Sequence, residues 1–380
     1  VLHFVDAFPT YVRPTLICPF DPRDYCDVPS RLRVEVVPRK LAEPVQRPGQ
    51  SVPITMAKYF MRNVWAWSSE ITRIARKYGA ELIHANNQAL SNTGAALAGW
   101  KLGIPVLSHQ KAYEYPGRMI REIIHRKVYT HHIATSYSIA DHLLELGLEP
   151  ARCSMIYDAI VPPSPMPVRR PHSGPLVVAM HSVLRPSKGQ DVFLQAVAPL
   201  LREDPESMPV QIAGAPPVDS DYPRQLVEWA ERLGIADRVE FVGHVRDPFQ
   251  FLSGVDISVH ASVEPEPFGR VAAESMLMGV PLVVAAGSGP AEYTLAAGAG
   301  LATPAGDVGA LTQAIRDLLA DEPRRQVMAD SGRRYALDEF APEKIARQLV
   351  NLYEAVVHRR APEETLADRT SNLEPLEVGR

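Results

Sequence analysis

Short apolar runs alternate with helix-like segments along most of this chain, and this alternation limits the folds that it can adopt. The runs are three to five residues long and rich in Val, Ile and Leu, which is typical of strands buried on both faces. Such strands, joined by helices, predict an α/β protein with doubly wound parallel sheets, in which ligands bind beyond the carboxyl ends of the strands. The predicted strands are residues 15–18, 34–37, 82–84, 105–108, 132–135, 154–157, 176–180, 210–214, 239–243, 257–260 and 282–284.

Prolines divide the chain into two predicted domains. Between residues 161 and 175 there are six prolines, so this segment cannot form a regular element and predicts a stiff linker. A length of 380 residues, with 46% hydrophobic and 22% charged residues, fits a globular protein of two or three domains without a membrane-spanning run. The expected parts are an N-terminal domain at 1–160, the linker at 161–175, a C-terminal domain at 176–340, a helix at 341–360 that can cross back to the N-terminal domain, and a loose tail at 361–380.

Two glutamates at the start of a predicted helix carry the strongest functional signal. Glu266 and Glu274 are separated by seven residues. Gly269 indicates a loop before the helix, and Gly279 is placed to end it. The N-terminus of a helix presents N–H groups that suit a diphosphate, and carboxylates accept hydrogen bonds from sugar hydroxyls. The alternative is an acidic surface loop before an ordinary amphipathic helix.

Residues 264–284 resemble the signature of the family 4 retaining glycosyltransferases. The resemblance implies the GT-B fold, with two Rossmann-like domains that face a central cleft. It implies that Glu266 contacts the transferred sugar and that Glu274 contacts the nucleotide ribose. A loop after the predicted strand at 239–243 resembles the part of the family that binds the nucleotide base. The implied donor-binding residues are Glu274, Phe268, Gly269, Arg270, Gly243 and His244.

A second loop, at residues 181–191, resembles the phosphate-binding stretch of the same family. Lys188 matches the family's lysine, but Val183 stands where the family usually has an arginine, and Arg185 is the candidate substitute. Lys188 and Arg185 would neutralise a departing diphosphate, each charged hydrogen bond being worth roughly 1.5–3 kcal/mol. The alternative is a pair of solvated cations on a loop.

Polar residues at predicted strand ends mark the N-terminal half. His109 occupies the place where the family often has a histidine near the donor sugar, which makes it a catalytic candidate beside Glu266, Lys188 and Arg185. A histidine at a strand end can also be purely structural. The candidates for the acceptor side are His84, Asn86, Asn87, Tyr113 and Arg118.

Charge and cysteine content bear on partners and on location. Residues 1–165 contain 19 basic and 14 acidic residues, and residues 166–380 contain 21 and 30, so the first half suits an anionic acceptor or membrane surface. Random variation in the number of charged residues on the surfaces of two large domains would give the same numbers. A basic helical pattern at 118–128 can lie on a membrane, although such helices more often face a core. Three cysteines without metal spacing, and no visible signal peptide, predict a cytoplasmic protein with at most peripheral membrane contact.

The connection between the strand-like residues 1–5 and the strand at 15–18 is unusually short. Nine residues lie between Val5 and Thr15, whereas a parallel crossover needs a dozen or more. We therefore expect the natural protein to have additional residues between about Phe8 and Arg13.

The predicted activity is retaining transfer of a sugar from a nucleotide-diphosphate-sugar donor to a hydroxyl group. UDP is favoured over GDP as the nucleotide, and the acceptor is a saccharide, a lipid-linked molecule or a small molecule. No metal-ligand spacing is found in the chain, so cations and a helix N-terminus should meet the phosphate charge without a metal or cofactor. No nucleic-acid partner is expected. Two alternatives stay open, a nucleotide-sugar epimerase of the same fold and a non-catalytic module that binds nucleotide sugars.

Overall fold

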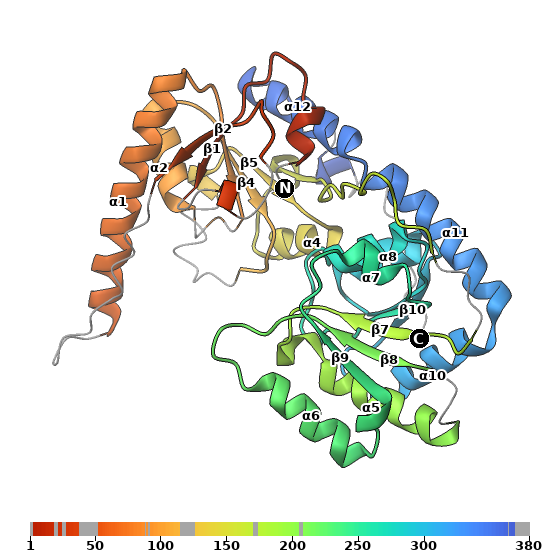
Figure 1. Ribbon diagram of the computed structural model, residues 1–380. Helices are drawn as coiled ribbons and strands as arrows, with labels where there is room; N and C mark the ends of the chain where they lie inside the picture. Colours follow the sequence, from red (N-terminus) through yellow and green to blue (C-terminus); the bar gives the residue numbers. More distant parts are fainter. Residues whose placement is uncertain are drawn as a thin grey trace. The chain divides into compact units, whose positions relative to one another are not determined.

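The computed structural model is a mixed α/β structure that divides into two compact units (Figure 1). One unit is Asp158–Ala341, called here the C-terminal unit. The other, the N-terminal unit, combines Val1–Tyr157 with Pro342–Arg380. The structure describes residues 3–18, 22–24, 28–37, 52–87, 89, 92–114, 126–169, 174–204, 208–363 and 365–368, with only the backbone of residues 3–4 and 52–63.

The C-terminal unit contains a six-stranded sheet in the order β12-β11-β10-β7-β8-β9, and every neighbouring pair is parallel. The chain moves outward from β7 through β8 to β9, then returns and adds β10 on the other side of β7. The sheet is therefore doubly wound, and its switch point lies at the carboxyl ends of β7 and β10. The strands are β7 Val178–His181, β8 Val210–Ala213, β9 Val239–Gly243, β10 Ile257–His260, β11 Leu282–Ala285 and β12 Gly300–Thr303.

Helices cover both faces of this sheet. Figure 1 shows α5, α6 and α10 on one face, and α7 and α8 on the other. Phe193 and Leu194 of α5 are fully buried and belong to the same apolar cluster as Met180 of β7 and Ile212 of β8. The helices are α5 Gln190–Glu203, α6 Tyr222–Leu233, α7 Pro248–Leu252, α8 Arg270–Leu277, α9 Gly289–Ala296, α10 Val308–Ala320 and α11 Glu322–Glu339, with short 3₁₀ helices η5 Pro186–Lys188 and η6 Ala236–Arg238.

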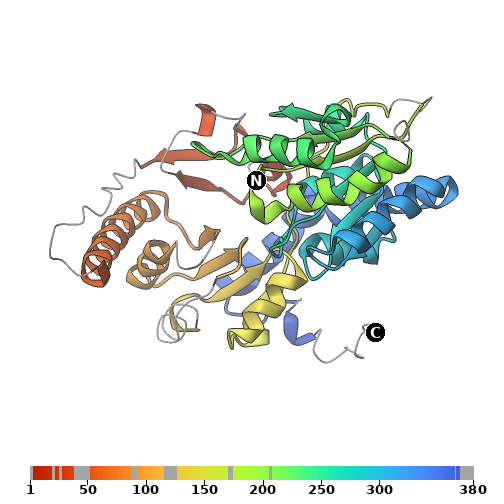
Figure 2. The same ribbon diagram turned by 90° about the horizontal axis from the view of Figure 1, so that it is seen from below.

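The N-terminal unit contains a parallel four-stranded sheet in the order β3-β4-β5-β6, and β1 pairs separately with β2 in a second parallel sheet. Helices α1 and α2 lie side by side (Figure 2). In the register of β3 with β4, Asn86 is opposite His109, so polar residues from two strand ends meet at one edge. The elements are β1 Thr15–Cys18, β2 Arg33–Val36, α1 Val52–Tyr78, β3 Ile83–Asn86, α2 Thr93–Leu102, β4 Val106–Gln110, β5 His131–Ala134, α4 Tyr137–Glu145, β6 Cys153–Met155 and α12 Pro342–Val357, with 3₁₀ helices η1 His3–Ala7, η2 Pro22–Asp24 and η4 Pro150–Arg152.

Helix α12 packs against the first described residues of the N-terminal unit. Phe8 lies edge-on to the ring of Tyr353, and the Tyr11 hydroxyl donates to Oε1 of Glu354 at 2.8 Å. The predicted loose tail begins differently from expectation, because Leu366 is 3% exposed and joins the apolar cluster of Ala134 and Ile139. Burying a leucine side chain contributes roughly 1.5–3 kcal/mol, and the leucines of this polar segment form no periodic pattern that would reveal the burial.

The strand expected at residues 1–5 is not formed in the described part of the chain. Residues His3–Ala7 form the 3₁₀ helix η1 instead. The guanidinium of Arg31 donates to the carbonyl oxygens of Phe8 at 2.7 Å and Pro9 at 2.8 Å, which holds the following turn. Among the described residues, then, no strand comes before Thr15, and the expected additional residues between about Phe8 and Arg13 stay a prediction.

The described part of the proline-rich segment, residues 161–169 and 174–175, has neither helix nor strand. Arg169 fixes it to the C-terminal unit by donating to the carbonyl oxygens of Gly279 at 2.6 Å and Val255 at 2.8 Å. The same guanidinium pairs with Oδ1 of Asp256 at 3.2 Å. This segment is therefore held against the sheet of the unit that follows it.

Candidate active site

Two loops meet at the switch point of the C-terminal sheet. One follows β7 and contains Lys188, and the other follows β10 and contains Glu266. The backbone N–H of Val263 donates to the carbonyl oxygen of Ser187 at 3.0 Å, which ties the loops together. The two sequence motifs, almost eighty residues apart in the chain, therefore form one site.

Gly189 lets these loops approach closely. Its φ angle is 73°, and an added Cβ atom would lie 2.1 Å from the carbonyl oxygen of Ala261. A side chain here would be strained by the left-handed backbone and would also push against the backbone of the second loop.

We expect Gly189→Ala to lower the stability of the protein by at least about 2 kcal/mol, because it combines backbone strain with a clash. Gly234→Ala is the matched control: Gly234 has a φ angle of 70°, and a Cβ atom added to it would meet nothing within 4 Å, so it reports the backbone strain alone. Thermal unfolding of both variants measures the difference. Equal losses of stability would show that the two loops separate easily.

Lys188 and Glu266 form an ion pair across the two loops. The Lys188 ammonium donates to Oε2 of Glu266, and the two side chains are 24% and 23% exposed. Both groups are thus partly accessible at the carboxyl ends of β7 and β10, where a ligand of a doubly wound sheet binds. In this structure the two predicted catalytic side chains, Lys188 and Glu266, are ion-pair partners of each other.

Several contacts hold the loop of Glu266 in place. The carbonyl oxygen of Glu266 accepts from the N–H of Gly289 at 2.8 Å. The Tyr293 hydroxyl contacts the carbonyl oxygens of Phe268 and Gly269, both at 2.9 Å. Phe268 is 4% exposed and packs against the rings of Tyr293 and Phe340, so its side chain supports the loop from within the core.

Helices α5 and α8 both begin at this site with a glycine as N-cap, Gly189 and Gly269. Neither cap has a side chain that could accept a hydrogen bond from the first N–H groups of its helix. The helix α9, in contrast, is capped by Ser288, and α10 by Asp307, through side-chain hydrogen bonds. The first N–H groups of α5 and α8 therefore receive no hydrogen bond from a capping side chain, an arrangement that suits an anion.

Glu274 lies in the middle of α8 and is 6% exposed. Its Oε1 accepts a hydrogen bond from the Arg270 guanidinium at 3.4 Å. Burial raises the pKa of Glu274 above its ordinary value of 4.5, and the positive charge of Arg270 opposes this shift. A buried carboxylate with one weak donor keeps most of its capacity to accept hydrogen bonds from a ligand.

The other predicted donor-side residues lie at the surface. Arg185 is exposed and precedes η5. Gly243, with a φ angle of 76°, ends β9 and is followed by the exposed His244. The sequence motifs gave no role to Gln190, whose buried amide donates to the Ser182 hydroxyl and to the carbonyl oxygen of Val183, both at 2.9 Å. Gln190 braces the loop that contains Lys188.

Two of the residues predicted in the N-terminal unit, His84 and His109, are in direct contact. Nε2 of His84 and Nδ1 of His109 are 3.1 Å apart, and Nδ1 of His84 lies 2.6 Å from the hydroxyl of Tyr353. Sequence patterns did not point to Tyr353, because it lies on α12, far along the chain. Burial lowers the pKa of His84 to about 3, and the charge of Lys111 acts in the same direction.

The remaining acceptor-side candidates are spread around the edge of the same sheet. Asn87 has a φ angle of 97°, and its N–H donates to the carbonyl oxygen of His109 at 3.0 Å. The carbonyl oxygen of Asn86 accepts from the Asn92 amide at 3.3 Å. Tyr113 shares a hydrogen bond with Ser138, and Arg118 lies outside the described residues.

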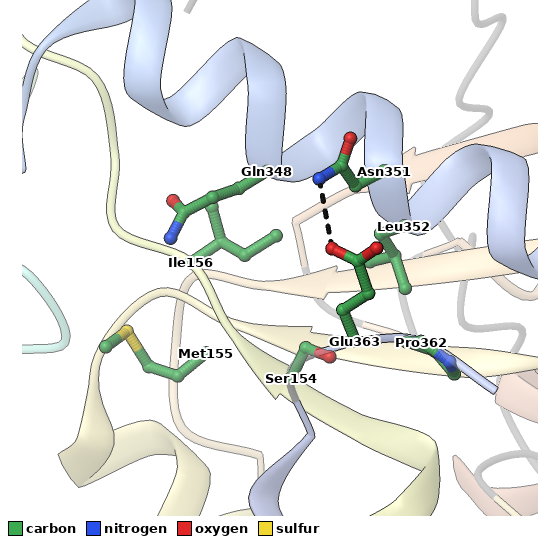
Figure 3. Close-up of a pocket in the computed structure, with 8 residues that line it drawn as sticks. All are labelled: Ser154, Met155, Ile156, Gln348, Asn351, Leu352, Pro362 and Glu363. Carbon is green, nitrogen blue, oxygen red and sulfur yellow. Dashed lines mark hydrogen bonds between the residues drawn. The ribbon is translucent and has the colours of Figure 1, made fainter.

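A separate pocket in the N-terminal unit lies between the end of β6, helix α12 and the segment after it (Figure 3). The amide of Asn351 donates to Glu363 at 3.4 Å across this pocket. Its volume of about 50 Å³ is far below the roughly 300–1,000 Å³ typical of ligand pockets. The pocket is too small for a nucleotide sugar and contains none of the predicted site residues.

Two family models match consecutive parts of the chain. The model described as Glycosyltransferase Family 4 matches residues 2–162, and the one described as Glycosyl transferases group 1 matches residues 167–335. The chain belongs to the family 4 glycosyltransferases. It is 26% identical to a D-inositol 3-phosphate glycosyltransferase of Gordonia bronchialis, over 90% of this chain and 74% of that protein. It is 32% identical to a GDP-mannose-dependent alpha-(1-6)-phosphatidylinositol monomannoside mannosyltransferase of Mycolicibacterium smegmatis, over 44% of each chain.

Solved structures give the same fold for this family 4 glycosyltransferase. Anabaena HepE in complex with UDP superposes with a TM-score of 0.68 at 23% identity, covering 86% of this chain and 87% of HepE. Sucrose-phosphate synthase of Thermosynechococcus elongatus superposes with a TM-score of 0.70 at 22% identity, covering 91% and 90%. Both support the GT-B fold with two Rossmann-like domains.

Two further features bear on membranes and metals. Within the described part of the chain, no helix combines the length and the apolar character that crossing a membrane requires. Among the same residues, no three His, Cys, Asp or Glu side chains are grouped as ligands for a metal ion.

Proposed function

We propose that this glycosyltransferase transfers a sugar from a nucleotide-diphosphate-sugar donor to an acceptor hydroxyl with retention of anomeric configuration. The observation that carries this proposal is the meeting of Lys188, Glu266 and the N-terminus of α8 at the switch point, with Glu274 one turn further. A cation and free N–H groups suit a diphosphate, and carboxylates suit the hydroxyls of a sugar and a ribose.

The names of relatives support a nucleotide-sugar donor without fixing the base. The mannosyltransferase of Mycolicibacterium smegmatis is GDP-mannose-dependent, and Anabaena HepE has been solved with UDP and with UDP-glucose. We favour UDP over GDP for this chain. The acceptor is a saccharide, a lipid-linked molecule or a small molecule. Peripheral contact with a membrane stays a prediction, since most of the basic segment at 118–128 lies outside the described residues.

The residues would act by positioning and by electrostatic stabilisation. In this mechanism Lys188, Arg185 and the N–H groups of α5 and α8 stabilise the charge on the departing diphosphate. Glu266 contacts the transferred sugar and orients its anomeric carbon as the bond to the phosphate breaks. The departing phosphate oxygen takes the proton of the acceptor hydroxyl on the same face, so no side chain is required as a nucleophile.

Glu274→Gln should weaken binding of the free nucleoside diphosphate roughly tenfold or more, because the ribose hydroxyls lose a charged acceptor. Titration calorimetry measures this affinity. A nucleotide that lacks both ribose hydroxyls is the matched control, and it should bind equally to the wild type and the variant. If Glu274→Gln weakened both nucleotides to the same extent, the carboxylate would not contact the ribose.

The same assignment predicts a pH dependence. The pKa of Glu274 is raised above 4.5, so on acidification the buried carboxylate takes up a proton earlier than an exposed one would. Nucleotide affinity of the wild type should therefore fall as the pH drops toward 4.5, and Glu274→Gln should lack this component.

Transfer should continue in the presence of EDTA, because Lys188, Arg185 and two helix N-termini are available for the phosphate charge. Initial rates with and without EDTA measure this directly. A rate that disappears on chelation and returns with Mg²⁺ or Mn²⁺ would contradict the metal-independent mechanism.

A further inference from the structure

Three side chains from separate parts of the N-terminal unit form a hydrogen-bonded chain. Tyr353 of α12 contacts His84 of β3, and His84 contacts His109 of β4. The distances are 2.6 Å from the Tyr353 hydroxyl to Nδ1 of His84 and 3.1 Å from Nε2 of His84 to Nδ1 of His109. Both ring nitrogens of His84 are therefore engaged, and neither is left for an acceptor molecule.

The geometry favours one direction of donation along this chain. A contact of 2.6 Å is short for an N–H donor but normal for a hydroxyl donor, so the Tyr353 hydroxyl donates to Nδ1 of His84. A neutral imidazole has one N–H, which in His84 must then be on Nε2 and donate to Nδ1 of His109. By the same rule the hydrogen of His109 is on its Nε2.

Both imidazoles are neutral at physiological pH. Burial, reinforced by the charge of Lys111, lowers the pKa of His84 to about 3 and that of His109 well below its ordinary value of 6.5. Each ring then has one N–H hydrogen, and the hydrogen bonds along this chain decide which of the two ring nitrogens holds it.

The Nε2 atom of His109 is where this chain ends. His109 is 5% exposed, and its Nε2 is buried without a hydrogen-bond partner among the described residues. Buried polar atoms in proteins are nearly always paired, so an unpaired one near the carboxyl end of a strand in a parallel sheet, where ligands bind, indicates a ligand contact.

We propose that Tyr353 and His84 are positioning residues that hold the hydrogen of His109 on Nε2, so that this N–H donates to an oxygen of the bound substrate. The role deepens the proposed transferase function and rests on it. His109 would accordingly act as a hydrogen-bond donor and not as a general base.

The tautomer can be read without any substrate. In protein labelled with ¹⁵N at histidine, two-bond ¹H–¹⁵N correlation spectra distinguish protonated from unprotonated ring nitrogens, and His109→Gln assigns the signal. We expect Nε2 of His109 to be protonated in the wild type and a mixture of both tautomers in Tyr353→Phe. His84→Gln gives a second, independent route to the same mixture. Protonation of His109 on Nδ1 in the wild type, or an unchanged spectrum in both variants, would overturn the proposal.

Kinetics then test whether the fixed N–H serves the reaction. Tyr129→Phe is the matched control, because the Tyr129 hydroxyl makes a comparable buried hydrogen bond, to the carbonyl oxygen of Ala89 at 2.8 Å, within the same unit. We expect kcat/KM for transfer to be about tenfold lower in Tyr353→Phe than in Tyr129→Phe, as for the loss of one oriented hydrogen bond. If Tyr353→Phe changed the tautomer of His109 but had the same kcat/KM as Tyr129→Phe, the proposed contact between His109 and the substrate would be overturned. A protein that shows the tautomer change but transfers no sugar from any nucleotide donor would refute the proposed function while leaving the positioning of His109 intact.

Discussion

Glu266→Gln should lower the rate of sugar transfer roughly 10²-fold, comparable to losing one preorganised electrostatic contact in an active site. The substitution keeps the size of the side chain and removes its charge. Because Glu266 would contact the sugar and not the nucleotide, the affinity for the free nucleoside diphosphate should not fall. It should be at least that of the wild type, since Lys188 is released from its ion pair and becomes available to the phosphates.

Single-turnover rates and calorimetry of nucleotide binding separate these two effects. Glu264→Gln is the matched control, because it removes the same charge from an exposed position two residues earlier in the same loop. This variant should keep both the rate of sugar transfer and the affinity for the nucleotide. If nucleotide affinity fell in Glu266→Gln by as much as turnover, the division of roles between Glu266 and Glu274 would be wrong.

The strands could be predicted wherever a buried segment is a continuous run of apolar residues. The strands of the C-terminal sheet up to β11 were predicted within a few residues, because each is a short Val- or Ile-rich segment between helices. Strand β12 was missed, since Gly300–Thr303 is built of small residues. An added Cβ atom at Gly300 would lie 2.1 Å from the carbonyl oxygen of Leu282, so close packing against β11 selects glycine there. Packing of this kind leaves no periodic signal.

The residues of the candidate site differ in the same way. Some could be predicted from the adjacent sequence, whereas others depend on contacts with distant parts of the chain. Glu266, Glu274 and Lys188 could be proposed as candidates because each stands in a contiguous sequence motif, and the structure brings Lys188 and Glu266 into contact. Tyr293 and Tyr353 were missed, because their hydroxyls act on residues 25 and 269 positions away along the chain. A tyrosine on an amphipathic helix looks the same in sequence whether it supports a catalytic loop or simply fills a core.

Lys188→Met should reduce both transfer and nucleotide affinity, each by roughly 10–100-fold, as expected for one charged hydrogen bond. The loss should exceed that of Arg185→Met. Lys188 is 24% exposed and held at the switch point by its pairing with Glu266, whereas Arg185 is exposed on the outer part of the loop. Equal losses in the two variants would mean that Arg185 shares the phosphate contact fully, in place of the arginine that Val183 replaces.

The ion pair gives this prediction a sharper form. In Lys188→Met the carboxylate of Glu266 loses its partner and stands as a free negative charge beside the expected position of the diphosphate, so part of the lost nucleotide affinity is repulsion. The double variant Lys188→Met/Glu266→Gln removes that repulsion and should bind the nucleoside diphosphate more tightly than Lys188→Met alone. Calorimetry of the four proteins in this double-mutant cycle measures the coupling directly. If the double variant bound the nucleoside diphosphate no more tightly than Lys188→Met alone, Glu266 would lie too far from the phosphates to repel them, and the departing diphosphate would lie outside the pair.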